Sequence, residues 1–128
     1  GNPWILSTAA LAQLLYNGAK QSLIENQLPL PEAQAHFSTL FQMISQSSQV
    51  SSFETPHQFA QSALNAGDGV LFRIRRHVED YGFHLWEQID RNNGNQTSAY
   101  DLTWSYATVL KAMHYRDQLT SQLGLNSD

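Results

Sequence analysis

The sequence contains no cysteine, so no disulfide bond, thiolate nucleophile or cysteine-ligated metal site can form within it. Charged residues are also scarce, at 14% of the chain, and the formal net charge is −4. Nucleic-acid binding needs a basic surface that neutralises phosphates, so this balance argues against a nucleic-acid partner. No apolar run reaches the length of about 18 residues that crosses a membrane, and we therefore expect no membrane-spanning helix.

Metal-binding patterns are missing as well. No histidine lies three or four residues from another; the five are His36, His57, His77, His84 and His114. Metal sites on helices commonly use such spacings, and the chain also lacks a glycine-rich phosphate-binding loop. The sequence therefore predicts neither a metal site nor a cofactor.

Helical patterns cover most of the 128 residues, which predicts an all-α fold of one domain. In the first helix we expect Asn2 to be the N-cap and Pro3 to occupy the first helical position. The following residues to Tyr16 are apolar on almost every side, which is typical of a buried helix. The rest of the chain is too short to enclose such a helix, so part of it is expected to stay exposed.

Two further helices have clear starting signals. One begins at Pro31 and has apolar residues at helical spacing to Ile44, before a polar loop over residues 45–52. The other begins at Pro56, and Thr55 with Gln58 is expected to form a capping box. This helix continues to residue 78, although Gly67 and Gly69 interrupt it and indicate close packing, a kink or a break.

The last part of the chain is expected to contain a long loop and two helices. Turn sequences at residues 80–82 and 92–95 enclose a segment that contains Glu87. A capping box of Ser98 and Asp101 is then expected to start a helix that continues to Met113, and a short last helix is expected over residues 115–123.

Glu87 is the residue in this loop that can carry chemistry. A carboxylate beside an indole, here that of Trp86, can act in acid–base catalysis, and indole faces bind sugar rings by stacking. The residues alone are also compatible with a plain loop carboxylate at Glu87 and with core packing of Trp4 and Trp104.

Three ordered segments resemble glucoamylases. They are GNPWILSTAA at residues 1–10, EQIDRNNG at residues 87–94 and DLTWSYA at residues 101–107. The resemblance covers residues 1 to about 116, and it implies that residues 1–128 are the C-terminal portion of a glucoamylase-type catalytic domain. The implied fold is part of an (α/α)6 barrel, of which the chain holds the last helices and an active-site loop.

The resemblance also implies a function. Glucoamylases are inverting glycoside hydrolases that release β-D-glucose from the non-reducing ends of α-1,4-glucans such as starch, maltooligosaccharides and glycogen. Glu87 matches their general base, and Trp104 and Trp4 match tryptophans at the subsites for the terminal glucose and the next one. The implied partners are an α-glucan and the missing N-terminal part of the same barrel.

The general acid would come from that missing part, so the isolated chain is expected to be inactive. The family favours a secreted or vacuolar protein over a cytoplasmic one, and the Asn95 glycosylation sequon has meaning only in a secreted one.

One departure from the family keeps alternatives open. Gly82 lies five residues before Glu87, whereas four is usual in the family. The extra residue can displace the base or simply bulge the loop. Two alternatives to an enzyme are a non-catalytic glucoamylase-like regulatory or glucan-binding module, and a plain helical interaction domain.

Overall fold

Four α-helices dominate the computed structural model, which describes residues 1–45 and 52–125. The helices are α1 (Ile5–Glu25), α2 (Pro31–Ser45), α3 (Pro56–Val78) and α4 (Thr103–Gln122). The shorter elements are the 3-10 helix η1 (Glu79–Tyr81) and the antiparallel strands β1 (Gln88–Ile89) and β2 (Gln96–Thr97). The prediction of an all-α fold is therefore confirmed.

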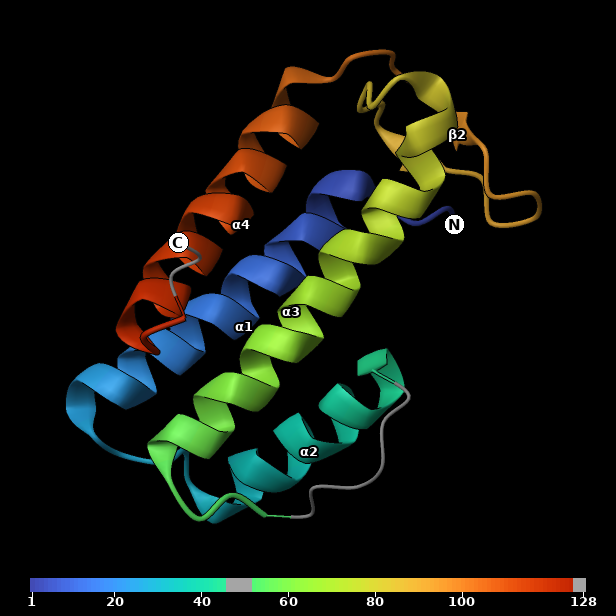
Figure 1. Cartoon of the computed structure of the whole chain (residues 1–128). Helices are drawn as coiled ribbons and strands as arrows, with labels where there is room; N and C mark the ends of the chain where they lie inside the picture. Colours follow the sequence, from blue (N-terminus) through green and yellow to red (C-terminus); the bar gives the residue numbers. More distant parts are fainter. Residues whose placement is uncertain (46–51, 126–128) are drawn as a thin grey trace.

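Helix α1 lies between α3 and α4 and packs against both, while α2 packs on the other side of α3 (Figure 1). The N-terminus, the end of α3, both strands and the start of α4 gather at one end of this arrangement. The fold thus brings the N-terminus together with the segment between α3 and α4, at the end where the predicted site residues lie.

The predicted starts of α2 and α3 are confirmed. Helix α2 begins at Pro31, and α3 begins at Pro56 after the N-cap residue Thr55. The backbone N–H of Gln58 donates to Thr55 Oγ1 at 3.1 Å, and the Gln58 side chain accepts from the N–H of Glu54 at 2.9 Å. This reciprocal pair satisfies donors at the start of the helix, as a capping box does. Most of the predicted polar loop, residues 46–51, lies outside the described residues.

The predicted start of the first helix is wrong. Helix α1 begins at Ile5, and Trp4 occupies the N-cap position without a side-chain cap. The side chain of Asn2 instead donates to Gln88 Oε1 at 3.3 Å and accepts from the backbone N–H of Arg91 at 3.3 Å. Asn2 therefore joins the N-terminus to the distant loop. Its side chain does not cap the helix, because the loop offers both an acceptor and a donor for it.

The predicted capping box before α4 is also wrong. Helix α4 begins at Thr103, and Leu102 occupies its N-cap position without a side-chain cap. Ser98 and Asp101 both have positive φ angles, 72° and 44°, and their side chains bind other residues of the site. The separate last helix over residues 115–123 is wrong too, because α4 continues without a break to residue 122.

Close packing explains the glycines of α3, which runs through both without a break. A Cβ atom at Gly67 would lie 2.3 Å from a ring carbon of Tyr16, and one at Gly69 would lie 3.0 Å from Cγ2 of Ile44. Of the three possibilities for these glycines, the structure therefore supports close packing.

A polar node, formed by Tyr16, Asp68 and Arg116, joins α1, α3 and α4 beside the contact of Gly67 with Tyr16. The hydroxyl of Tyr16 donates to Asp68 at 2.8 Å, and Arg116 donates to both oxygens of the same carboxylate at 2.7 Å. Burial and the Asp68 carboxylate both raise the pKa of Tyr16, so its hydroxyl stays protonated. The node connects α1, α3 and α4 through one carboxylate.

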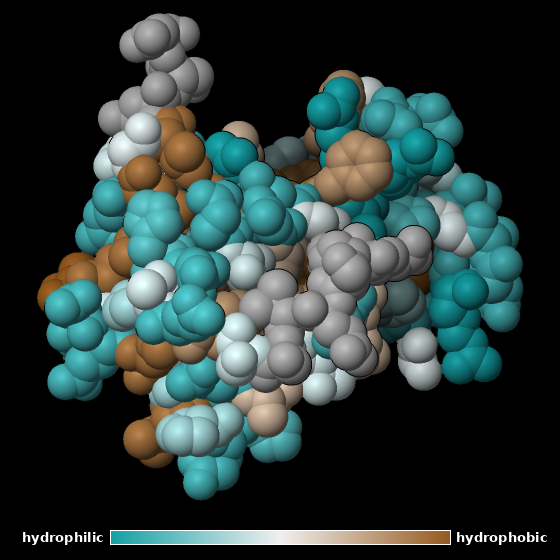
Figure 2. Space-filling model, turned by 60° about the horizontal axis from the view of Figure 1, so that its bottom comes forward, coloured by the Kyte–Doolittle hydropathy of each residue, from teal (hydrophilic) through white to brown (hydrophobic). Residues whose placement is uncertain are grey.

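Part of α1 stays exposed, as predicted. Its residues Ile5, Ala9, Ala12, Leu15, Tyr16, Ala19 and Ser22 are buried. However, the side chains of Leu14 and Ile24 are 62% and 63% exposed. On the face drawn in Figure 2, hydrophobic surface appears in several separate spots among hydrophilic side chains. Among the described residues, no helix combines the length and apolar character needed to cross a membrane.

Candidate functional site

Backbone hydrogen bonds place Trp4 beside Glu87. The N–H of Ile5 donates to the carbonyl of Glu87 at 3.1 Å, and the N–H of Ile89 donates to the carbonyl of Pro3 at 2.9 Å. Trp4 lies between these two bonds and forms an isolated antiparallel bridge with the residue after Glu87. The N-terminal segment thus adds an extended edge to the loop that carries the carboxylate.

The start of α4 is attached to the same loop. The N–H of Leu102 donates to the carbonyl of Leu85 at 2.9 Å, and the hydroxyl of Ser105 donates to the carbonyl of Trp86 at 2.8 Å. Trp104 lies between these two anchors. The structure therefore brings all three predicted site residues to one end of the helices.

Both tryptophans project from the core. Trp4 is 38% exposed and Trp104 is 64% exposed, so neither is packed in the core that the described residues form. Exposed tryptophan surface at one end of the molecule can pack against a ligand such as a sugar ring. Trp86, in contrast, is half-buried between Tyr81 and Tyr100, with ring centroids 5.4 Å and 4.1 Å away.

Two side chains hold the half-buried carboxylate of Glu87. Its Oε2 atom accepts hydrogen bonds from the hydroxyl of Ser98 and from the side-chain amide of Gln88, the latter at 3.3 Å. The backbone N–H of Glu87 donates to the carbonyl of Ala99 at 3.0 Å, which extends the pairing of β1 with β2. The carboxylate is therefore oriented by one donor on β1 and one on the residue that follows β2.

Backbone strain is concentrated around this loop. Phe83, Ser98 and Asp101 have φ angles of 63°, 72° and 44°, in the left-handed region that side chains disfavour. Each such residue costs on the order of 1 kcal/mol, and the conformation persists only where surrounding contacts impose it. Such contacts are present on both sides of Glu87.

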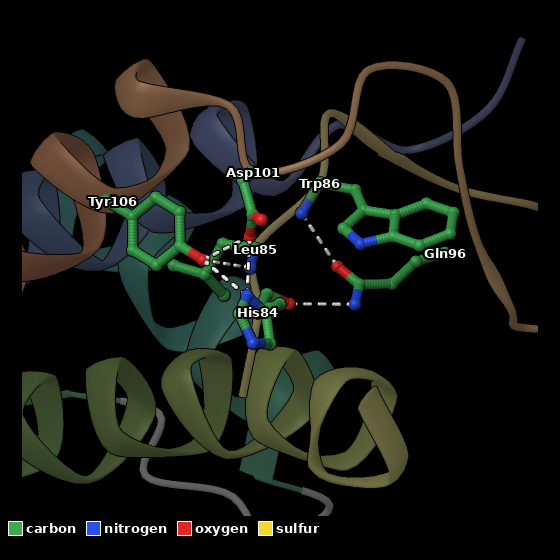
Figure 3. Close-up of polar contacts among 6 residues, drawn as sticks. All are labelled: His84, Leu85, Trp86, Gln96, Asp101 and Tyr106. Carbon is green, nitrogen blue, oxygen red and sulfur yellow. Dashed lines mark hydrogen bonds and ion pairs between the residues drawn. The ribbon is translucent and has the colours of Figure 1, made fainter. Parts of the chain in front are cut away.

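One group of contacts is a polar cluster of three side chains (Figure 3). Asp101 Oδ1 lies 2.7 Å from Nδ1 of His84 and accepts from the hydroxyl of Tyr106 at 2.6 Å. The hydroxyl oxygen of Tyr106 in turn accepts from the backbone N–H of Leu85 at 3.0 Å. The hydrogen bond from Tyr106, followed by that with His84, lowers the pKa of Asp101, and the carboxylate raises the pKa of Tyr106.

Gln96 provides a second group of contacts. Its side chain is only 4% exposed, accepts from the N–H of Trp86 at 2.9 Å and donates to the carbonyl of His84 at 2.8 Å. No pattern in the sequence pointed to Gln96, to the role of Ser98 or to the cluster of His84, Asp101 and Tyr106. A Gln between turn residues and a Tyr within an apolar stripe give no local signal for partners this distant in the chain.

A cavity of about 620 Å³ opens between α3 and α4. Its lining is mostly apolar and consists of Asp68, Leu71, Phe72, Ile74, Arg75, Val78, Phe83, Leu85, Val109, Met113, Arg116 and Asp117. None of Trp4, Glu87 and Trp104 belongs to this lining, so the cavity is not formed by the predicted site residues. Within residues 1–45 and 52–125, no cluster of three or more His, Asp or Glu side chains could hold a metal ion.

Comparison with known proteins identifies relatives over most of the chain. A sequence model of the family described as "Glycosyl hydrolases family 15" matches residues 1–114. A glucoamylase of Blastobotrys adeninivorans is 29% identical over 126 residues, which cover 95% of this chain and 20% of that protein. A glucoamylase of Saccharomycopsis fibuligera is 33% identical in an alignment of 133 positions, which covers 93% of this chain and 25% of that protein.

Solved structures agree with the sequence relatives. The glucoamylase structure from Saccharomycopsis fibuligera matches with a TM-score of 0.75 and 31% identity, over 94% of this chain and 27% of that one. The family 15 glucoamylase from Hypocrea jecorina matches with a TM-score of 0.74 and 29% identity, over 100% of this chain and 22% of that one.

The chain spans about a fifth to a quarter of the length of the curated relatives it matches. Glucoamylase structures are (α/α)6 barrels, and the observed helices match part of one, so the predicted partial barrel is confirmed. The alternative of a plain helical interaction domain whose motifs are coincidental is wrong. The chain belongs to glycosyl hydrolases family 15.

Proposed function

We propose that this chain is the C-terminal portion of the catalytic domain of an exo-acting glycoside hydrolase, and that Glu87 is its general base. The substrate class is α-1,4-glucans, from whose non-reducing ends the complete protein releases β-D-glucose with inversion. The observation that carries the proposal is the oriented carboxylate of Glu87 at the end of the molecule where Trp4 and Trp104 are exposed.

The contacts of Glu87 suit a general base. Ser98 and Gln88 both donate to Oε2, so the proposal assigns proton removal from the attacking water to Oε1. In an inverting hydrolase the water attacks the anomeric carbon on the face opposite the leaving group. The new C–O bond forms as the bond to the leaving oxygen breaks, and attack from this face gives a product of the opposite anomeric configuration. Glu87 accepts the proton that the attacking water loses.

The second carboxylate of this reaction is assigned to the rest of the protein. A general acid must protonate the leaving glycosidic oxygen, and in inverting enzymes it lies about 6.5–9.5 Å from the base. The proposed N-terminal part of the same barrel supplies this acid. We therefore expect the isolated 128 residues to release no glucose from maltose, and detectable release by the purified chain would contradict this assignment.

Trp4 and Trp104 are proposed to bind the substrate. Both residues are exposed, and indole offers apolar surface that can pack against the carbon-bound hydrogens of glucose rings. Trp104 is assigned to the terminal glucose and Trp4 to the next one. This binding places the scissile bond near the loop of Glu87, because neighbours of both tryptophans in the chain are hydrogen-bonded to that loop.

The test uses the complete protein that contains this chain. In maltotriose the first glucose released comes from the non-reducing end alone, and proton NMR of the fresh products is expected to show it as β-glucose before mutarotation. Replacing Glu87→Gln should remove most of the activity, whereas the control Glu79→Gln should retain it, because Glu79 is an exposed carboxylate at the end of α3. Initial release of α-glucose, or an active Glu87→Gln variant, would contradict the proposal.

One observation favours a second candidate function. Gly82 lies five residues before Glu87, one more than is usual in glucoamylases, and the loop between them is strained at Phe83. A non-catalytic regulatory or glucan-binding module would result if this loop misplaced the carboxylate. In that case the complete protein would release no glucose from maltose but would still bind maltooligosaccharides.

A further inference from the structure

We propose that Asp101 and Tyr106 are positioning residues that fix Glu87 through the backbone segment immediately before it. This inference rests on the proposed function, in which Glu87 is the general base. Neither residue touches the carboxylate of Glu87 in the structure. They act on residues 84–86, which lead directly into it, and they connect that segment to the start of α4.

The backbone of residues 84–86 is held by hydrogen bonds throughout. Its partners come from η1, β2, the segment before α4 and α4 itself. The N–H groups of His84, Leu85 and Trp86 donate to the carbonyl of Tyr81, the hydroxyl of Tyr106 and the side chain of Gln96, respectively. The carbonyls of the same three residues accept from the side chain of Gln96, the N–H of Leu102 and the hydroxyl of Ser105, respectively. A shift of this segment along the chain direction must break several of these bonds together.

Tyr106 accepts one of these bonds with its hydroxyl oxygen, and Asp101 sets the orientation of that hydroxyl. The hydroxyl has one hydrogen, which it donates to Asp101 at 2.6 Å. A lone pair on its oxygen then faces the N–H of Leu85, which donates at 3.0 Å. Because Asp101 accepts the hydroxyl hydrogen, Tyr106 is kept as an acceptor for the backbone. Asp101 therefore acts on the loop through Tyr106 (Figure 3).

The backbone of Asp101 also helps to position the segment before Glu87. Its φ angle of 44° is a strained conformation that surrounding contacts must impose. The next residue, Leu102, donates its N–H to the carbonyl of Leu85, and Trp104 follows two residues later. The same contacts thus fix the segment before Glu87 and the segment that carries Trp104, so base and proposed sugar-binding residue are positioned together.

The polar node of Tyr16, Asp68 and Arg116 resembles the cluster of Asp101, Tyr106 and His84. It therefore serves as a control that distinguishes the positioning of Glu87 from stabilisation of the fold. Asp68 accepts from the hydroxyl of Tyr16 and pairs with Arg116 between the helices. Asp101 accepts from the hydroxyl of Tyr106 and pairs with His84 in the loop. Both nodes contain an aspartate, a tyrosine and a basic side chain, but the first has no bond to the loop of Glu87.

The experiment compares single substitutions at both nodes in the complete protein. Tyr106→Phe removes the hydroxyl, and Asp101→Asn removes the charge while keeping a residue type that tolerates positive φ. We expect each to lower kcat for maltose by roughly 10- to 100-fold, because small misplacements of a reacting group have effects of that size. For Tyr106→Phe, KM should change little, since substrate binding does not require the base. Asp101→Asn is expected also to raise KM, because Asp101 precedes the segment that carries Trp104. The controls Tyr16→Phe and Asp68→Asn should lower Tm and leave kcat unchanged.

A double variant tests whether Asp101 acts through Tyr106. If it does, Tyr106→Phe combined with Asp101→Asn has the kcat of Tyr106→Phe alone, because the path is already broken. Independent multiplication of the two effects would overturn this part of the inference. So would a fall in kcat that follows Tm equally at both nodes, because that result indicates a structural role alone.

Failure of this inference can be separated from failure of the proposed function by including Glu87→Gln. If Glu87→Gln is inactive while Tyr106→Phe and Asp101→Asn keep the kcat of the wild type, Glu87 remains the base and the positioning role is wrong. If Glu87→Gln is as active as the wild type, the proposed function fails, and with it the inference that depends on it.

Discussion

Replacing Gly67→Ala is expected to destabilise the protein, although alanine normally favours a helix. In an exposed helix interior this replacement stabilises by up to about 1 kcal/mol. At Gly67, however, the new Cβ atom would lie 2.3 Å, 2.6 Å and 3.0 Å from three ring carbons of Tyr16. That ring is fully buried, and its hydroxyl is bound to Asp68, so it cannot move aside freely.

The magnitude follows from these opposing effects. Inserting a methyl group into a filled core costs typically about 1–3 kcal/mol, and a lost hydrogen bond between Tyr16 and Asp68 adds about 1 kcal/mol. These costs exceed the helix-propensity gain, so we expect a net loss of about 2 kcal/mol. Gly18 provides a matched control because it lies within α1 and a Cβ there meets nothing within 4 Å.

Urea unfolding followed by circular dichroism measures both effects in the complete protein. Gly67→Ala should lower the unfolding midpoint, whereas Gly18→Ala should leave it unchanged or raise it. If Gly67→Ala is as stable as Gly18→Ala, the packing of Tyr16 against α3 is not as the structure describes, and close approach does not explain Gly67.

Three further predictions concern the cap, the tryptophan and the carboxylate cluster. Thr55→Ala should cost about 1 kcal/mol of unfolding free energy, measured by urea denaturation, because it removes the acceptor for the N–H of Gln58. Trp104→Ala should raise KM for maltose in the complete protein, measured by glucose release, because it removes the proposed stacking surface for the terminal glucose. NMR titration should give Asp101 a pKa below the ordinary aspartate range, and Tyr106→Phe should raise it, since the bond from Tyr106 is the main cause of the lowering. The stability that this bond contributes is therefore complete above the unfolded-state pKa and is lost as the pH falls through the lowered folded-state pKa.

Local signals predicted the helices whose starting contacts are local. Thr55 and Gln58 lie three residues apart, and their capping bonds form within one turn. Pro31 and Pro56 likewise begin helices because their fixed φ suits the first turn and their missing N–H has no partner there. Such contacts depend on neighbours in the sequence, and a sequence pattern therefore captures them.

The same kind of signal failed where a distant partner competes for the side chain. Asn2 is a common N-cap type, but it binds Gln88 and Arg91, 86 and 89 positions along the chain. Ser98 binds Glu87 and Asp101 binds Tyr106 in place of capping α4. These contacts exist only after the loop has folded against the N-terminus and the start of α4.

The candidate site was predictable only in part for the same reason. Glu87, Trp4 and Trp104 belong to segments that resemble glucoamylases, and these segments drew attention to them. Gln96 was missed, although its buried side chain connects two backbone groups of the loop, because nothing in its local sequence distinguishes it from a turn residue. Long-range hydrogen bonds that orient the candidate catalytic group become visible only in the folded structure.

The most direct test of the central claim is the kcat for glucose release from maltose by the complete protein, compared between wild type and Glu87→Gln. General-base catalysis contributes about 10²–10⁴-fold to a reaction rate. The account predicts a loss of that size with little change in KM, because glutamine keeps the shape of the side chain but cannot remove a proton from water. A Glu87→Gln variant with the kcat of the wild type would contradict the account and place the base at another residue.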